Sequence, residues 1–281
     1  MPDRYAVIGH PIAHSQSPRI HGLFARATGQ DMLYEAIDGG GEAGGFERAL
    51  AAFRAAGGLG VNVTLPFKLQ ALACADEADD AARLAGAANA LRFVDGRIEA
   101  RNFDGAGLVR DIVVNLGLPL AGRRVLLLGA GGAARGAVLP LARAGAACIA
   151  IANRTAAKAR ALAHELAAHV PASCALTGGG LDDLPRGQAF DVVINATSAS
   201  LGGGDAPAAP PAAFAPAALA YDMVYGKGLT PFLRQAQGAG AGRLADGIGM
   251  LVEQAAEAFH WWRGARPDTA PVIAQLAKPL V

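Results

Sequence analysis

Several residue types are scarce in this chain of 281 residues, and each shortage excludes a class of protein. The three cysteines, Cys74, Cys148 and Cys174, are an odd number at wide spacing, without a CxxC pair or a nearby histidine cluster. Neither a disulfide framework nor a metal site is indicated. Charged residues make up only 17%, the net charge is +1, and no basic run stands out. The sequence therefore lacks the electrostatic footprint of a protein that binds nucleic acid or anionic membranes.

Long hydrophobic runs are also missing, although 52% of the residues are hydrophobic. No stretch of about 18 uncharged apolar residues lacks a proline or glycine interruption, so no membrane span is expected. The opening MPDRYAVIGHP contains an apolar run too short for the core of a signal peptide. Glycine and proline together stay below the 25 to 30% or so typical of low-complexity chains. We expect a globular cytoplasmic enzyme of one large or two medium domains.

The first third alternates short β-branched runs with helical patterns, which is typical of βαβ units and a mainly parallel sheet. The expected elements are a strand at 5–8, a helix from about Pro18, a strand at 33–37, a helix from about Phe46 and a strand at 59–65. For the first helix, Ser17 is the expected N-cap, Pro18 suits the first helical position and Gly29 can end the helix.

A hairpin and a long helix follow. Asp95 and Gly96 supply the positive φ angles of a tight turn between strands at 90–94 and 97–100. After Asp104, an apolar-periodic helix is expected to run to about Leu116 and to stop at Gly117. A domain boundary is expected near residues 102–118.

The second block repeats the βα pattern, with strands expected at 124–128, 148–152, 190–195 and 219–223. Residues 202–218 are so rich in proline and glycine that we expect a surface loop. A helix from Asp246 to about Trp262 would return to the first domain. The expected domains are therefore 1–105 plus 246–281, and 106–245.

A glycine-rich turn at residues 129–134 joins the first strand of this block to a helix. Gly129 and Gly131 occupy the first two places of a GxGxxG fingerprint, and Ala134 fills the third, where a small residue is allowed. The first glycine permits the turn, and the second lets a pyrophosphate approach the helix N-terminus. The alternative is a glycine turn that serves packing alone. The other glycine groups, at 39–41, 178–180 and 202–204, are expected to be ordinary turns.

The end of the next strand indicates which dinucleotide would bind. An NAD-binding unit has an acidic residue there for the ribose hydroxyls. This chain has Asn153, Arg154 and Thr155, followed by Lys158, and no carboxylate. A guanidinium can grip a 2′-phosphate through paired hydrogen bonds, which favours NADP. The alternative is that Arg154 is merely a solvated residue at a helix start.

Uncharged hydrogen-bonding side chains gather where strands are expected to end, which in open α/β sheets is where ligands bind. They are Ser15 and Ser17, then Asn62, Thr64 and Lys68, then Asn89, Asn102 and Asp104. Such a set suits a polyhydroxylated substrate. Each residue alone has a simpler explanation: Ser17 and Asp104 as helix caps, the asparagines as turn formers, and Lys68 as a solvated surface lysine.

Together these segments closely resemble the shikimate dehydrogenase family, over nearly the whole chain. The matching segments are GHPIAHSQSP, GVNVTLPFK, LAGAANAL, NFDGAG, GAGGAARG, ANRT, NATS, YDMVYGKGLTPFL and ADGIGMLVEQAA. The resemblance implies NADPH-dependent, metal-free reduction of 3-dehydroshikimate to shikimate in aromatic amino-acid biosynthesis. It also implies a two-domain α/β fold, with a substrate domain, a Rossmann-type doubly wound NADP-binding domain and the active site in the cleft between them.

The resemblance further implies a role for individual residues. Lys68 and Asp104 are the implied catalytic pair, with Lys68 as general acid and base. The implied substrate contacts are Ser15, Ser17, Asn62, Thr64, Lys68, Asn89, Asp104, Tyr225 and Gln254. The implied NADP contacts are Asp80, Gly129, Ala130, Gly131, Gly132, Ala133, Asn153, Arg154, Thr155, Lys158, Thr197, Met223 and Gly247. The implied partners are the small-molecule substrate and, at most, a second copy of the chain, as a monomer or homodimer.

Two departures from the family pattern bear on specificity. Phe103 stands where the family usually has the threonine of NTDG, and ASLGGG follows NATS in place of the more common pattern. The first departure leaves room for quinate as an additional substrate. Two other classes remain as alternatives: a regulatory module that binds a dinucleotide without chemistry, and an enzyme that uses Lys68 for a Schiff base.

Overall fold

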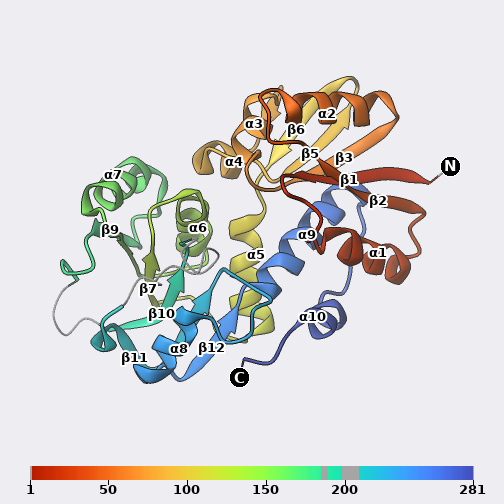
Figure 1. Ribbon diagram of the computed structural model, residues 1–281. Helices are drawn as coiled ribbons and strands as arrows, with labels where there is room; N and C mark the ends of the chain where they lie inside the picture. Colours follow the sequence, from red (N-terminus) through yellow and green to blue (C-terminus); the bar gives the residue numbers. More distant parts are fainter. Residues whose placement is uncertain (1, 185–188, 198–208, 281) are drawn as a thin grey trace. The chain divides into compact units, whose positions relative to one another are not determined.

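The computed structural model describes residues 2–184, 189–197 and 209–280 (Figure 1). The chain folds into two compact units, Met1–Gly107 with Val252–Val272 and Leu108–Leu251 with Ile273–Val281. Among the described residues, no helix has the length and apolar character needed to cross a membrane. Each unit is an α/β layer structure built on a six-stranded sheet, and the expected α/β class is confirmed.

The first unit carries a mixed sheet of order β2-β1-β3-β5-β6-β4. Its elements are β1 (Asp3–Gly9), α1 (Ser17–Thr28), β2 (Met32–Asp38), α2 (Gly45–Ala55), β3 (Gly58–Val63), α3 (Lys68–Ala73), β4 (Glu77–Ala78), α4 (Asp80–Ala85), β5 (Ala90–Val94) and β6 (Arg97–Arg101). The pairings of β1 with β2, β1 with β3, and β4 with β6 are parallel, while β5 is antiparallel to both of its neighbours. The prediction of a mainly parallel sheet is confirmed.

The reversal at β5 follows from the hairpin that the sequence predicts. Asp95 and Gly96 both have positive φ angles, 50° and 77°, as the two central residues of a tight hairpin turn require. This turn joins β5 to β6 and returns the chain to the parallel direction. The carboxyl end of β6 therefore leads straight into the segment that carries Asp104.

The start of α1 differs from the prediction at one residue. Gln16 is the N-cap, and Ser17 is the first helical residue, so the expected capping role of Ser17 is wrong. The backbone NH of Ser17 instead reaches the Oγ atom of Ser15, at 3.3 Å. Gly29 ends the helix with a φ of 65°, as predicted. The Ser17 side chain is thus left for tertiary contacts.

Helices cover both faces of the first sheet. One core cluster includes Phe46 and Leu50 of α2 together with Val61 of β3. On the other side, Phe24 of α1 meets Phe259 edge-on, with 5.7 Å between the ring centroids. Figure 1 accordingly shows α2 above the strands and α1 below them. The first sheet is therefore packed between α2 and α1 around its central strands.

Two helices carry the chain from one unit to the other and back. The first begins as α5 (Asp104–Arg110), continues as one π-helical turn, η1 (Asp111–Asn115), and ends near Gly117, whose φ is 61°. The second is α9 (Ile248–Arg263). The predicted helices are confirmed, whereas the π turn has no signal in the apolar periodicity.

The second unit is a parallel doubly wound sheet of order β12-β11-β10-β7-β8-β9. Its elements are β7 (Arg124–Leu128), α6 (Gly132–Arg143), β8 (Cys148–Ala152), α7 (Ala156–Leu166), η2 (Ala167–His169), β9 (Ala175–Gly179), β10 (Phe190–Asn195), η4 (Pro211–Ala213), β11 (Phe214–Asp222), α8 (Pro231–Gly238) and β12 (Arg243–Asp246), with α10 (Ala270–Leu276) after α9. The strands predicted at 124–128, 148–152 and 190–195 are confirmed, and β9 and β12 were not predicted.

The loop predicted for residues 202–218 is wrong at its end. Strand β11 starts at Phe214, and its pairing with β10 slips between Phe214 and Leu219, which marks a bulge. Ala217, inside that bulge, has a φ of 64°. A bulge tolerates Pro216, which cannot donate to a ladder, within a strand. Residues 202–208, with the glycines at 202–204, lie outside the described part.

Candidate functional site

The first unit brings Lys68 and Asp104 together, as the sequence predicts. Lys68 is the first residue of α3, and Asp104 is the first residue of α5. The Lys68 Nζ atom donates to Asp104 Oδ2 at 2.6 Å, and about a quarter of each side chain is exposed, 26% and 24%. An ammonium group held in this way keeps a fixed direction while it can still reach a ligand.

Asn89 anchors this pair from behind. Its Nδ2 atom donates to Asp104 Oδ1 at 2.8 Å and to Gln254 Oε1 at 3.1 Å. Its Oδ1 atom accepts from the backbone NH of Phe103 at 2.9 Å. Asn89 is 2% exposed, so these bonds are shielded from water. Because both amide hydrogens are used inside the protein, Asn89 acts chiefly by orienting Asp104 and Gln254.

A second polar group lies beside the first, around Asn62 at the end of β3. The Nδ2 atom of Asn62 donates to the backbone oxygen of Asn89 at 3.2 Å. Its Oδ1 atom accepts from the Tyr34 hydroxyl at 2.7 Å. Burial raises the pKa of the Tyr34 hydroxyl, and the neighbouring Ser17 side chain partly offsets this rise. Asn62 and Asn89 thus belong to one connected network, with Ser17 close to Tyr34.

Thr64 lies just beyond β3, against the end of β1. A Cβ atom placed on Gly9 would lie 2.4 Å from Thr64 Cγ2, so only glycine at position 9 lets the two segments approach this closely. The strands β1 and β3 are parallel neighbours, which brings their carboxyl ends to one edge. That edge is where the sequence analysis expected the substrate side chains.

Two further predicted residues belong to other elements of the chain. Tyr225 follows β11 in the second unit and is 39% exposed. Asp80 begins α4 in the first unit, where its carboxylate pairs with Arg83 at 2.7 Å.

Phe103 does not face the polar group. Its ring meets Trp261 edge-on, with 5.8 Å between centroids, in an apolar cluster with Ala90 and Ala258. The Phe103 side chain, which replaces the family's threonine, therefore packs in the hydrophobic core. The backbone of Phe103 still contributes, since its NH holds Asn89.

The glycine-rich turn lies in the second unit, between β7 and α6. Gly129 has a φ of 110°, and a Cβ atom there would come within 2.9 Å of Thr197 Cγ2. Around Gly131 and Gly132, by contrast, a Cβ atom would have no neighbour within 4 Å. Gly129 is thus required by the fold, whereas the other two glycines leave space in front of the α6 N-terminus. That space suits a diphosphate, which the helix dipole also favours.

An open hollow adjoins this turn. It is lined by Ala130, Gly131, Gly132, Arg135, Lys158, Ala161, Leu162 and Glu165. The one carboxylate in this lining, Glu165, is paired with Arg135 at 2.5 Å. Lys158 brings a positive charge to the same wall, so the hollow combines backbone NH groups with cations.

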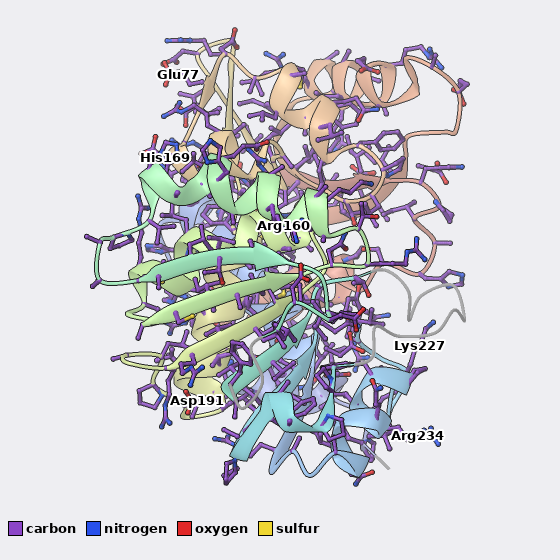
Figure 2. All side chains as sticks on the ribbon, turned by 90° about the vertical axis from the view of Figure 1, so that its left-hand side faces the viewer. Glu77, Arg160, His169, Asp191, Lys227 and Arg234 are labelled. Carbon is purple, nitrogen blue, oxygen red and sulfur yellow. The ribbon has the colours of Figure 1, made fainter. Side chains whose placement is uncertain are left out.

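The turn after β8 carries the predicted specificity residues. Asn153 shapes it, because its Nδ2 atom donates to the backbone oxygen of Thr155 at 3.1 Å. Arg154 and Lys158 are exposed and, within the described residues, have no ion-pair partner. Further along α7, Arg160, labelled in Figure 2, is by contrast paired with Asp183 at 2.6 Å. The two unpaired cations therefore suit an anionic group such as a 2′-phosphate.

Two residues that the sequence analysis missed hold Thr197 and Met223 in place. Fully buried Asn195 accepts from the Thr197 hydroxyl at 2.7 Å, and its backbone oxygen accepts from the NH of Met223 at 3.0 Å. Asp222, also buried, accepts from Asn195 Nδ2 at 3.0 Å. Asn195 lies in the NATS motif and Asp222 in the YDM segment noted above. Their polar side chains within apolar strands were the signal that could have identified them. The described residues stop at Thr197 and resume at residue 209, so the ASLGGG segment lies outside them.

Gly247 has a packing reason of its own. A Cβ atom there would lie 2.3 Å from the backbone oxygen of Met223. The chain before α9 therefore lies backbone to backbone against the segment after β11. This contact, rather than a ligand alone, requires glycine at position 247.

Three family models match the chain. Residues 7–91 match "Shikimate dehydrogenase substrate binding domain", residues 112–202 match "Shikimate / quinate 5-dehydrogenase", and residues 247–277 match "Shikimate 5'-dehydrogenase C-terminal domain". Together they cover well over half of the chain. The substrate domain model contains Ser15 to Asn89, and the central model contains the glycine-rich turn.

Individual relatives agree over the full length. A shikimate dehydrogenase (NADP(+)) of Aromatoleum aromaticum is 56% identical, over 99% of this chain and 98% of its own. The structure of an Ael1 enzyme from Pseudomonas putida has a TM-score of 0.92 at 57% identity, over 99% and 100% of the two chains. Shikimate 5-dehydrogenase from Thermus thermophilus, solved with NADP(H) and shikimate, has a TM-score of 0.83 at 34% identity, over 97% of each. The chain belongs to the family of NADP-dependent shikimate dehydrogenases.

Proposed function

We propose that this enzyme catalyses the reversible, NADPH-dependent reduction of 3-dehydroshikimate to shikimate in aromatic amino-acid biosynthesis. The observation that carries the proposal is the Lys68 and Asp104 pair, 2.6 Å apart, at an edge rich in uncharged hydrogen-bonding groups. The full-length relatives named for this activity support it.

Lys68 is the proposed general acid and base. In the reductive direction its ammonium donates a proton to the ketone oxygen as that oxygen gains negative charge, and the neutral amine is then reprotonated from solvent. In the oxidative direction the neutral amine accepts the hydroxyl proton. The bound nucleotide supplies or takes the hydride in this reaction.

Asp104 is proposed to direct Lys68 and to accept a hydrogen bond from the substrate. Its Oδ2 atom already holds the ammonium, and its Oδ1 atom is held by Asn89. With both oxygens engaged, Asp104 holds the Lys68 ammonium in a fixed direction.

The remaining substrate contacts are proposed for residues of the same edge and for one residue of the second unit. Ser15, Ser17, Asn62, Thr64, Gln254 and Tyr225 form this set, and Asn89 supports it by orienting Asp104 and Gln254. Their hydroxyl and amide groups match the hydroxyl-rich substrate in kind. No metal is assigned a role.

The NADP site is proposed for the second unit. The turn Gly129–Ala133 would hold the diphosphate, and Asn153 with Arg154, Thr155 and Lys158 would hold the 2′-phosphate. Thr197, Met223 and Gly247 would line the nicotinamide side. The open space at Gly131 and the unpaired cations of the β8 to α7 turn fit such a ligand. Asp80 is retained only as the resemblance implied it.

Domain roles, compartment and assembly complete the proposal. Residues 1–105 with 246–281 would form the substrate domain, and 106–245 the NADP domain. The enzyme would work in the cytoplasm as a monomer or homodimer.

The deciding experiment measures oxidation of shikimate and of quinate with NADP⁺ and with NAD⁺. We expect the highest kcat/KM for shikimate with NADP⁺. Comparable turnover of quinate would support a dual enzyme, a possibility that the family description "Shikimate / quinate 5-dehydrogenase" keeps open. No turnover with any pair would favour a regulatory module, and borohydride trapping of a substrate adduct would favour Schiff-base chemistry.

A further inference from the structure

Behind Ser17 and Asn62 lies a buried pair of rings that the mechanism above does not use. His21 of α1 stacks on Tyr34 of β2, with 4.1 Å between centroids and 5° between the ring planes. His21 is fully buried, and Phe259 stacks on it at 6.1 Å. Such a packed ring pair has little freedom to move.

Both rings direct their polar atoms to Asn62. The Nε2 atom of His21 lies 3.1 Å from Asn62 Oδ1, and the Tyr34 hydroxyl lies 2.7 Å from the same oxygen. The opposite end of the amide is fixed as well, because Asn62 Nδ2 faces the backbone oxygen of Asn89, which can only accept. The orientation of the Asn62 amide is therefore determined.

This orientation fixes the remaining hydrogens. Asn62 Oδ1 can only accept, so His21 carries its proton on Nε2 and Tyr34 donates its hydroxyl hydrogen to Asn62. Both lone pairs of Asn62 Oδ1 are used. Within the described residues, the second hydrogen on Asn62 Nδ2 has no acceptor and can be donated to a ligand.

His21 stays neutral in this arrangement. Burial lowers the pKa of His21 to about 3. Its Nδ1 atom is buried without a hydrogen-bond partner, so a second proton would have no acceptor there. The imidazole is accordingly a constant single donor and not a proton-transfer group.

We propose that Tyr34, supported by the stacked His21, is a positioning residue for substrate recognition: its hydroxyl sets the orientation of Asn62. This inference rests on the proposed function, since it concerns how the same site binds shikimate. Tyr34 acts through Asn62 and is assigned no contact with the reacting atoms. When the hydroxyl is lost, His21 Nε2 is the remaining donor to Asn62 Oδ1 among the described residues.

The test replaces Tyr34 by phenylalanine, which keeps the ring stack and removes only the hydroxyl. Loss of one buried hydrogen bond is worth about 0.5–1.5 kcal/mol, or roughly a 2- to 13-fold change in an equilibrium constant. We expect Tyr34→Phe to raise the KM for shikimate about fivefold. The KM for NADP⁺ should stay within twofold, and kcat should change less than the KM for shikimate.

The matched control is Tyr5→Phe. Tyr5 lies in the same unit, stacks on Trp262 at 4.8 Å and has the Arg263 guanidinium 5.9 Å from its ring, and it is not one of the hydrogen-bond donors to Asn62. This variant should leave the KM for shikimate unchanged. An equal rise in both variants, or no rise in Tyr34→Phe, would overturn the inference.

A second pair of variants covers a failure of Tyr34→Phe to fold. His21→Gln retains an NH donor near the Nε2 position, whereas His21→Leu removes it. We expect the KM for shikimate to be several-fold lower in His21→Gln than in His21→Leu, and equal values would overturn the inference. Absence of shikimate oxidation in the wild type would instead refute the proposed function, and the inference with it.

Discussion

Asn89 Nδ2 lies 2.8 Å from Asp104 Oδ1, and this bond decides which oxygen of Asp104 faces Lys68. With Oδ1 held, Oδ2 is the atom that receives the ammonium at 2.6 Å. The general acid is therefore aligned by a neutral amide that is itself almost wholly buried. The alignment of Lys68 thus depends on Asn89, which donates its amide hydrogens to Asp104 and Gln254.

The first prediction concerns Asn89→Ala. The change removes one hydrogen bond each from Asp104, Gln254 and the NH of Phe103, and each such bond is worth about 0.5–1.5 kcal/mol. We expect the free energy of unfolding to fall by about 2–4 kcal/mol and kcat to fall about 100-fold. Urea unfolding and steady-state kinetics measure the two effects. A normal kcat in the folded variant would contradict the role given to Asn89.

The second prediction separates two glycines of the nucleotide turn. Gly129→Ala should lower the free energy of unfolding by about 1–3 kcal/mol, because its φ of 110° and the nearby Thr197 do not accommodate a side chain. Gly131→Ala should keep that stability, since a Cβ atom there meets nothing in the protein. It should nevertheless raise the KM for NADPH. If Gly131→Ala has an unchanged KM for NADPH, the diphosphate does not approach the backbone there.

The third prediction tests the 2′-phosphate site with Arg154→Glu. A carboxylate repels the phosphate that a guanidinium grips, so the KM for NADPH should rise at least tenfold while that for NADH changes little. Arg160→Glu, on the helix α7 that follows this turn, is the control and should leave both constants unchanged (Figure 2). An equal effect of Arg154→Glu on both cofactors would remove the 2′-phosphate argument.

The fourth prediction follows from the pKa of His21, which burial lowers to about 3. Between that value and about 6.5 the unfolded chain binds a proton that the folded chain does not, so stability rises with pH. The contribution is complete above about pH 6.5 and is lost as the pH falls through this window. From pH 7 to pH 5, wild type should lose about 2 kcal/mol more than His21→Phe. The free energy of unfolding is measured with urea at both pH values. If wild type and His21→Phe lose the same amount between pH 7 and pH 5, His21 does not titrate in this way.

Local sequence signals predicted part of the fold well. The Asp95 and Gly96 turn, the Gly29 helix end and the Gly129 turn each depend on a backbone conformation that few residues adopt, so the residue type itself is informative. Strand β9 was missed for the opposite reason. Gly178, expected to lie in an ordinary turn, is part of this strand. It must be glycine because a Cβ atom there would lie 2.2 Å from the backbone oxygen of Ala159 in α7, a contact that no local pattern reveals.

The same limit applies to the site. Lys68, Asn89 and Asp104 were predicted because polar residues at strand ends converge on one edge of a sheet. Gly39 was expected to lie in an ordinary turn, yet a Cβ atom there would lie 2.4 Å from Phe67 Cε2. The roles of Asn195 and Asp222 likewise arise from contacts between separate strands. Tertiary packing, which the sequence does not display, decides these cases.

The most direct test of the central claim is the turnover of Lys68→Ala, with the exposed Lys278→Ala as control. Loss of a general acid and base typically costs about 10²–10⁴ in rate. We predict a fall in kcat of that size, with dissociation constants for shikimate and NADPH, measured by calorimetry, within about tenfold of wild type. Near-normal turnover in Lys68→Ala would contradict the account.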